Sequence, residues 1–146
     1  MEITRHFTAT AIVVYDGKAL LHLHKKLGMW LPVGGHIDRD ELPEEAAVRE
    51  AKEESGLEIT LYRSDKIIDL KDARQLMRPE YVLLEDINQY HQHIDFVYFA
   101  TAATDKLQSA EGETNDLKWL TKDEIEQLDM RNNVKVLCLE ALETIK

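Results

Sequence analysis

The chain has 146 residues, of which 44% are hydrophobic and 32% are charged, a composition typical of a soluble globular protein. Its formal net charge of -10 argues against a nucleic-acid polymer as a partner, because no excess of Lys and Arg exists to replace counterions. No apolar run approaches the length of a membrane span, and the first residues carry no signal-peptide pattern, so we expect no membrane partner.

The length also bounds the domain organisation. A chain of this size fits a single domain over residues 1–146, with enough apolar residues for a proper core. Cys138 is the single cysteine, so no internal disulfide can form, and we expect a reducing, cytoplasmic location.

The first part of the chain predicts a hairpin and then a loop. Residues 5–15 are β-branched and apolar, which favours a strand. An Asp-Gly pair at positions 16 and 17 is a hairpin turn signal, and residues 18–25 form the predicted returning strand. Residues 28–35 predict a loop with a short extended piece at its centre.

A helix of about three turns follows this loop. Asp40 can cap its N-terminus, Pro43 suits a first helical position, and Gly56 is a natural stop, so we predict a helix over residues 43–55. Small apolar side chains fall on one face, where they allow close packing against a sheet: Ala47, Val48 and Ala51.

Three carboxylates share another face of this helix. Glu50, Glu53 and Glu54 are spaced at i, i+3 and i+4, so their charges repel one another unless something positive lies there. Arg49 is four residues before Glu53 and can pair with it, but one arginine does not neutralise three acids. A hard divalent cation would, and oxygen ligands on a rigid helix suit Mg²⁺ or Mn²⁺.

The second half of the chain predicts further strands and two more helices. In chain order we expect one or two strands over 57–70, a polar loop over 71–80, strands over 81–86 and 94–101, an acidic loop over 104–116 and a short strand over 117–120. Thr121 or Asp123 caps a short helix to Leu128, and a last helix over 133–145 places Val134, Leu137, Cys138, Ala141 and Ile145 at core spacing. Strands mixed with three helical segments predict an α/β or α+β sandwich.

The helix and its flanks carry a spaced pattern that resembles the Nudix box. All seven fixed positions are present at the right spacing, and Ala51 and Leu57 fill the two apolar positions: Gly35, Glu41, Arg49, Glu50, Glu53, Glu54 and Gly56. The resemblance to the Nudix hydrolase family implies an α/β/α sandwich around a mixed β-sheet. One departure precedes the box. The family typically has Trp, two residues and Pro-Gly-Gly, whereas here Trp30-Leu31-Pro32-Val33-Gly34-Gly35 places the proline one position earlier.

The resemblance also implies roles for these residues. Glu50, Glu53 and Glu54 correspond to the family's metal-binding glutamates, with Glu53 as a ligand or the general base, and the Gly35 carbonyl corresponds to a further ligand. Arg49 is expected to orient Glu53 and to pair with Glu41, which makes Glu50, Glu53 and Arg49 the predicted catalytic set. The alternatives are a solvated charged face and an ordinary ion pair.

An extra acid before Trp119 is also implied, since many family members carry one that serves as a metal ligand or base. Glu111 and Glu113 lie in the acidic loop there, and we choose Glu113 by position. The alternative is a solvated loop.

Several residues outside the box are candidates for the substrate pocket. His91, His93 and Asp95 point to one side of a predicted strand, which fits a zinc site, a pocket wall near the metal or a surface cluster. We prefer the pocket wall, with His93 and Asp95 as substrate contacts. Trp30 either lines the pocket or anchors the loop. The cations available to contact phosphate are Lys25, Lys26, Arg63, Arg74 and Arg78, and Lys25 is the one named as a candidate substrate contact.

The resemblance implies Mg²⁺-dependent hydrolysis, with Mn²⁺ as an alternative ion, of a diphosphate linkage in a nucleoside diphosphate derivative or a nucleoside triphosphate. The alternative from another class is a domain that binds and senses nucleotide without hydrolysis. Isomerase chemistry on an isoprenoid diphosphate would need a cysteine early in the chain, and Cys138 is badly placed for it. We also expect a homodimer, because residues 81–84 and 94–99 offer more apolar strand than one sheet face needs.

Overall fold

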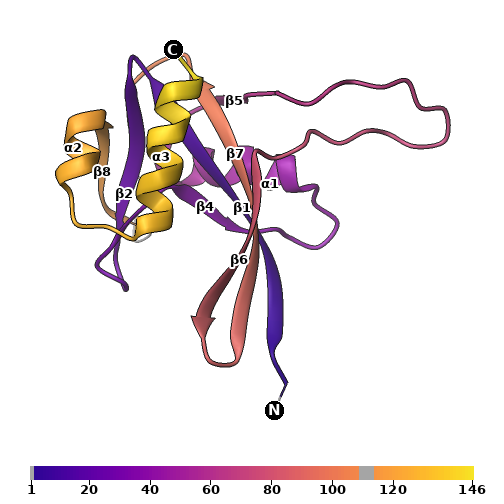
Figure 1. The fold of residues 1–146 in the computed structure, drawn as a ribbon, viewed down its shortest axis with the longest axis horizontal. Coiled ribbons are helices and arrows are strands. Elements are labelled where there is room, and N and C mark those ends of the chain that lie inside the picture. The colour runs from indigo at the N-terminus through magenta and orange to yellow at the C-terminus, as the bar shows by residue number, and fades with distance from the viewer. Residues whose placement is uncertain (1, 109–113) are drawn as a thin grey trace.

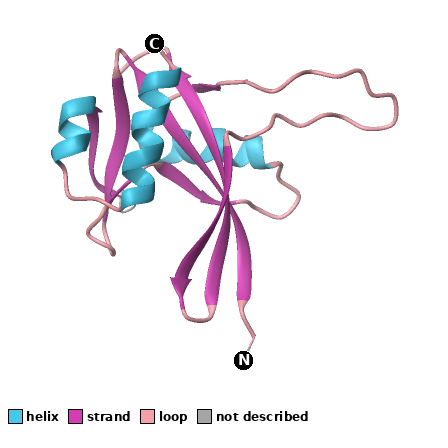
Figure 2. Cartoon of the chain, viewed as in Figure 1, coloured by secondary structure: helices cyan, strands magenta, loops and turns pink. Residues whose placement is uncertain are grey.

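A computed structural model describes residues 2–108 and 114–146 of the chain, and these form eight strands and three helices (Figure 2). In chain order they are β1 (Thr4–Tyr15), β2 (Lys18–His24), β3 (Trp30–Leu31), β4 (Val33–His36), α1 (Pro43–Ser55), β5 (Ile59–Leu61), β6 (Tyr81–Asn88), β7 (His91–Ala102), β8 (Thr114–Thr121), α2 (Lys122–Gln127) and α3 (Asn132–Thr144).

The strands form one mixed sheet centred on β1 and β7. These two strands pair in parallel over most of their length, while the other pairings are antiparallel. The strand β1 pairs with β2 only at Val14 and Tyr15, and with β4 from Thr8 to Ala11. The strands β2 and β4 therefore separate along β1, which opens the sheet beside the Gly-Gly segment of β4.

Helices cover both faces of this sheet (Figure 1). Ala46, Ala47 and Ala51 of α1 are fully buried on one face, since only small side chains allow the helix to lie so close to the sheet. On the other face α3 buries the core positions expected of it: Val134, Leu137, Cys138 and Ala141. The predicted α/β/α sandwich around a mixed sheet is confirmed.

Local sequence signals account for several element ends. Asp16 and Gly17 have φ angles of 49° and 72°, the positive values that a tight hairpin turn requires. Gly56 ends α1 with a φ of 78°, and its N–H donates to the Lys52 carbonyl. The short helix α2 begins after Thr121, whose hydroxyl accepts the Glu124 N–H.

The predicted cap of α1 is wrong. The residue at the cap position is Leu42, and Asp40 lies outside the helix with a φ of 69°. The Glu45 side chain accepts a hydrogen bond from the Leu42 N–H at 2.9 Å. A glutamate in the first turn of the helix, and not Asp40, therefore pairs with the backbone at the helix start.

Two other expectations also needed correction. Of the segment predicted as one or two strands over 57–70, only β5 forms, and residues 62–80 form a long loop that extends from the body (Figure 1). Ile67 and Ile68 are exposed, because no strand edge is paired with them. The strand β8 is longer than predicted, since it pairs with β2 from Lys18 to His24.

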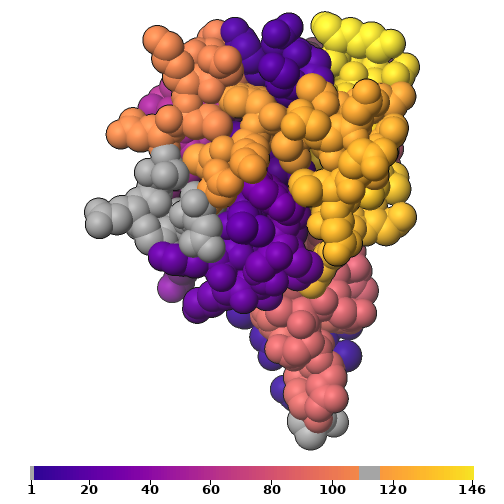
Figure 3. All heavy atoms as spheres, turned by 90° about the vertical axis from the view of Figure 1, so that its left-hand side faces the viewer, coloured from indigo at the N-terminus to yellow at the C-terminus, as the bar shows by residue number. Residues whose placement is uncertain are grey.

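An arm without a helix projects from the body (Figure 1). It consists of the first part of β1 and the hairpin of β6 and β7, and this hairpin tapers away at the bottom of Figure 3. Phe7, Val82 and Leu84 on this arm are more than half exposed. No helix in the described ranges has both the length and the apolar character needed to cross a membrane.

Candidate functional site

A cavity of about 470 Å³ lies where the opened sheet meets α1, β6 and the start of α3. Glu50, Glu53 and Glu54 line it from α1, and the backbone of Gly34 and Gly35 lines it from β4. The carboxylates that the sequence places on one helix face therefore share one cavity with the glycine pair.

The two glycines allow close approach. A Cβ atom on Gly35 would lie 2.5 Å from Glu50 Oε1, and one on Gly34 would lie 2.5 Å from the Ala9 carbonyl oxygen. At Gly34 the obstacle is the backbone of β1, so a larger residue does not fit there, whereas at Gly35 the Glu50 carboxylate would have to move aside. The backbone of Gly35 thus lies directly beside a predicted metal-binding group.

The three glutamates differ in their surroundings. Glu54 is buried: its Oε1 accepts the Gly34 N–H at 2.7 Å, and its Oε2 lies 3.5 Å from Nε2 of His22. Burial lowers the pKa of His22, and nearby His24 lowers it further, which favours a neutral ring beside Glu54. The Glu53 side chain is 47% exposed, against 16% for Glu50, so Glu53 is the most open of the three to solvent.

Arg49 connects both sides of α1. It donates two hydrogen bonds to Glu41, at 2.7 Å from Nε and 3.0 Å from Nη2, while Nη1 lies 3.0 Å from Glu50 and 3.2 Å from Glu53. Nη2 also donates to the His36 carbonyl at 3.0 Å. The hydrogen bonds from Arg49 lower the pKa of the Glu41 carboxyl, and those to Glu41 and Glu50 raise the pKa of the guanidinium. Arg49 is therefore fixed by Glu41 and the His36 carbonyl on one side and contacts two of the predicted metal-binding glutamates, Glu50 and Glu53, on the other.

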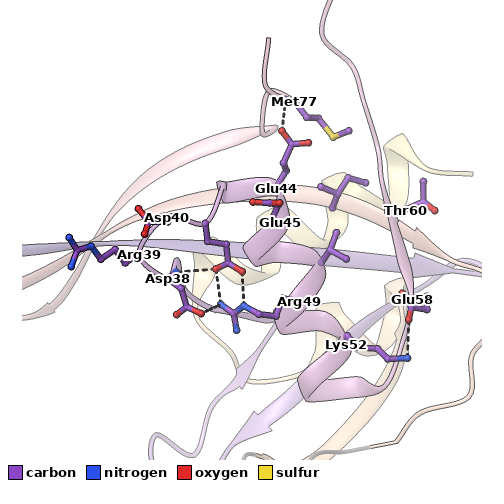
Figure 4. A pocket seen from close by; sticks show the side chains of 13 residues that line it. Asp38, Arg39, Asp40, Glu44, Glu45, Arg49, Lys52, Glu58, Thr60 and Met77 are labelled. Carbon is purple, nitrogen blue, oxygen red and sulfur yellow. Dashed lines mark hydrogen bonds and ion pairs between the residues drawn. The ribbon is translucent and has the colours of Figure 1, made fainter. Parts of the chain in front are cut away.

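A second, broader hollow lies on the outer side of α1 (Figure 4). Glu41, Arg49 and Lys52 line it, and Lys52 pairs with Glu58 at 3.0 Å. Glu50, Glu53 and Glu54 are not among its lining residues. The larger hollow therefore contacts the Arg49–Glu41 pair and not the cavity that holds the three carboxylates.

Two further acids face the cavity from the sheet. Asp95 is buried and accepts hydrogen bonds from the Thr8 hydroxyl at 3.0 Å and the Thr10 hydroxyl at 2.9 Å. Burial raises the pKa of Asp95 despite these bonds. Burial and the Asp95 charge raise the pKa of Glu85 to about 7, and the charge of Arg131 opposes that rise.

Sequence reasoning missed Glu85, although a signal was present. In the strand β6 the side chains that line the cavity are Leu83, Glu85 and Ile87, so a carboxylate stands between two apolar residues at strand spacing. Such a position predicts a buried or pocket-facing acid. Thr8, Thr10 and His22 were also missed, and nothing in their local sequence distinguishes them from ordinary strand residues.

The other predicted site residues fall into three groups. His93 and Asp95 line the cavity, whereas Trp30 and Lys25 are not among its lining residues. Trp30 is half-buried, with Nζ of Lys118 5.4 Å from the centre of its ring. Glu111 and Glu113 lie outside the described residues.

A group of histidines lies beside the cavity, and two of its members, His36 and His93, line it. Ligand nitrogens of His6, His36 and His91 all lie within 4.8 Å of one another, and the His93 ring is 5.0 Å from those of His36 and His91. Burial and the neighbouring histidines lower the pKa of His93. The sequence placed His91, His93 and Asp95 together. In the structure His6 and His36 from two other strands join the two histidines, while Asp95 accepts hydrogen bonds from Thr8 and Thr10.

The donor set of the cavity fits a hard divalent cation. Among the described lining residues the carboxylates are Glu50, Glu53, Glu54, Glu85 and Asp95, and Arg131 is the single arginine or lysine. This excess of negative charge in a partly buried space is unfavourable without a counter-cation. Carboxylate oxygens held on one rigid helix are the ligands that Mg²⁺ and Mn²⁺ prefer.

Comparison with known proteins identifies the family of this fold. A family model described as the NUDIX domain matches residues 4–139. A solved NUDIX-family hydrolase from Clostridium perfringens is 42% identical, with 99% of this chain and 100% of that chain covered and a TM-score of 0.90. A MutT NUDIX hydrolase from Burkholderia pseudomallei is 24% identical, with 98% and 99% covered and a TM-score of 0.70. A C. elegans Ap4A hydrolase is 18% identical, with 95% and 96% covered and a TM-score of 0.71, and these last two matches support the fold alone.

Proposed function

The chain belongs to the NUDIX family of hydrolases, a pyrophosphohydrolase family, and on this premise we propose that it hydrolyses a diphosphate linkage in a small nucleotide. The substrate class is a nucleoside diphosphate derivative or a nucleoside triphosphate, and Mg²⁺ is the proposed cofactor, with Mn²⁺ as the alternative. The chain is proposed to act as a single NUDIX domain over residues 1–146.

One observation carries the proposal: three carboxylates of α1 face one cavity beside a glycine pair that a larger residue would close. Glu50, Glu53 and Glu54 are proposed to hold the ion together with the Gly35 backbone carbonyl. When bound, a divalent ion draws negative charge from the diphosphate and lowers the pKa of a coordinated water.

The protein's own groups orient this arrangement. The Gly34 N–H and His22 fix the buried Glu54, while Arg49 holds Glu50 and Glu53 from the other side of α1. Glu41 in turn fixes the guanidinium of Arg49 through two hydrogen bonds. Such supporting contacts preserve the ligand geometry, and their loss typically costs 10–100-fold in metal affinity or activity.

Glu53 is the proposed general base or, as the alternative, a further metal ligand beside Glu50 and Glu54. Its greater exposure leaves it accessible to a water that enters from solvent. A base must be ionised and within hydrogen-bond reach of the proton that it accepts. Glu113, the other acid chosen from the sequence, stays a prediction.

The substrate contacts proposed from the sequence are His93 and Asp95, which line the cavity, and more distantly Trp30 and Lys25. Similar structures carry the names Ap4A hydrolase and ADP-ribose pyrophosphatase, at 18% and 20% identity. Both names describe small nucleotides with phosphoanhydride bonds, which supports the class proposed here without selecting a member.

The direct test is a screen of the purified chain against nucleoside triphosphates, dinucleoside polyphosphates and nucleoside diphosphate sugars, with Mg²⁺ or Mn²⁺. Released phosphate and pyrophosphate are measured before and after chelation of the metal. Glu50→Gln should abolish turnover of the best substrate. Glu58→Gln, which removes an exposed acid paired with Lys52 outside the cavity, should not. Tight nucleotide binding without any product would favour the sensing function instead.

A homodimer is also proposed, with the projecting arm as its interface. Phe7, Val82 and Leu84 are 55%, 56% and 60% exposed, and the register places Phe7 and Leu84 beside the same residue of β7, Ile94. An apolar sheet face of this kind is unfavourable in water and is typical of an interaction surface. Sedimentation of wild type and Leu84→Glu at micromolar concentration tests this, and a monomeric wild type would exclude it.

A further inference from the structure

Four of the chain's six histidines gather where the projecting arm joins the body. They come from three strands: His6 from β1, His36 from β4, and His91 and His93 from β7. Strand register brings them together, because His6 is directly opposite His93, and His36 is paired with Thr8, two residues along the same face from His6. We refer to His6, His36 and His91 as the histidine cluster.

The cluster has nearly the geometry of a metal site. One ligand nitrogen from each of its members lies within 4.8 Å of the others. Around a tetrahedral ion with bonds of about 2.0–2.1 Å, donor nitrogens lie roughly 3.3–3.4 Å apart. The remaining difference, at most about 1.5 Å, is within the reach of side-chain rotation, since terminal torsions of histidine are soft.

The surroundings of the cluster suit a cation. His6 and His36 are exposed and His91 is half-buried, so an ion can reach the nitrogens from solvent. Glu85 pairs across the sheet with His93, and Asp95 follows His93 on the same face of β7, so two acids lie beside the cluster. When ionised, these acids favour a nearby cation without occupying the nitrogens themselves.

We propose that the histidine cluster binds one divalent transition-metal ion of the Zn²⁺ class, separate from the hard ion proposed at the glutamates. Imidazole nitrogen suits Zn²⁺, Co²⁺, Ni²⁺ and Cu²⁺, whereas Mg²⁺ prefers oxygen, so the two sites select different ions. Three imidazoles leave the fourth position of a tetrahedral ion to water.

The bound ion would connect β1, β4 and β7 at the root of the arm. Because His36 also lines the cavity, the ion would lie at the edge of the cavity that holds the carboxylates of α1. An ion bound only to the folded chain stabilises it in proportion to the logarithm of its concentration.

The experiment measures Zn²⁺ binding to the full chain after removal of metals, by titration calorimetry in a large excess of Mg²⁺. The Mg²⁺ competes for the carboxylates, and the loss of Zn²⁺ binding in the histidine variants assigns the remaining ion to the histidines. The variants are His6→Asn and His91→Asn, with His24→Asn as the matched control on β2, outside the cluster. Visible absorption of bound Co²⁺ gives a second readout, because its intensity distinguishes tetrahedral from octahedral coordination.

The expected result is one Zn²⁺ per chain with a dissociation constant at or below the micromolar range. Each cluster variant should weaken binding at least tenfold and lose the tetrahedral Co²⁺ bands, while His24→Asn keeps both. Circular dichroism confirms that the variants are folded, which is expected for a change at exposed His6. Zn²⁺ affinity equal to wild type in both cluster variants, or no Zn²⁺ bound in excess Mg²⁺, would overturn the proposal. Neither result depends on hydrolytic activity, so the proposed function stands or fails separately.

Discussion

Two neighbouring groups of side chains, which we call the carboxylate end and the histidine end of this region, are assembled in opposite ways. At the carboxylate end Glu50, Glu53 and Glu54 come from a single helix and present oxygen. The histidine end is the histidine cluster, which comes from three strands and presents nitrogen, and of its members His36 lines the cavity. The first arrangement follows from the spacing of a short segment, whereas the second exists only after the strands have paired in register. Two donor chemistries with different origins therefore lie close together.

The largest expected effect tests the carboxylate end. Glu53→Gln keeps the shape of the side chain and removes its charge and basicity, so the loss should appear in kcat and not in KM. We expect kcat to fall by about 10²-fold or more, the range for a lost general base. Steady-state kinetics on the best substrate measure this.

The control for this prediction is Glu58→Gln, an exposed acid on the outer side of α1. A Glu53→Gln enzyme with nearly wild-type kcat would exclude Glu53 from the chemistry, and the comparison of the two ends would then rest on metal binding alone.

An intermediate effect separates the two ends by ion. Mg²⁺ should raise the melting temperature of wild type, and the double change Glu50→Gln with Glu54→Gln should remove that rise. Zn²⁺ added over Mg²⁺ should give a further rise that His6→Asn with His91→Asn removes. An ion at 100 times its dissociation constant contributes about 2.7 kcal/mol, which corresponds to several degrees.

Each double variant should keep the response to the other ion, as measured by thermal unfolding at matched ionic strength. If either pair of changes removes both responses, the two ends are one site and the contrast between them is wrong.

The smallest expected effect concerns Glu85, which lines the cavity and pairs across the sheet with His93. Its pKa of about 7 is above the ordinary value, so ionisation of Glu85 costs folding stability as the pH rises through the interval from its ordinary pKa to about 7. Glu85→Gln should therefore raise the melting temperature relative to wild type at pH 8, with little difference at pH 5. A gain of equal size at both pH values would show that charge is not the cause.

The sequence predicted the carboxylate end well because its determinants are local. Pro43, Gly56 and the spacing of apolar residues set the limits of α1, and its periodicity alone brings the three glutamates to one face. Even there, the cap was misassigned, because Asp40 and Glu45 are both acids near the helix start and only the backbone path decides between them.

The histidine end could not be predicted in the same way. His91 and His93 were recognised as one-sided, but His6 and His36 join them only through the pairing of β1 with β7 and β4. Within the segment predicted as one or two strands over 57–70, only β5 formed, and the rest did not form a strand for a related reason. Ile67 and Ile68 have good strand propensity, yet a strand forms only where a neighbouring edge accepts it.

The long loop over residues 62–80 has a consequence for how the protein could be divided. A cut at its exposed Lys71 would leave α1 with its carboxylates in one fragment, and Glu85, Asp95 and α3 in the other. The fragments would still share the parallel pairing of β1 and β7 from Thr4 to Val14, the most extensive pairing between strands of the sheet. The loop is therefore a natural point at which to split the chain into two complementing halves, each of which carries one side of the cavity.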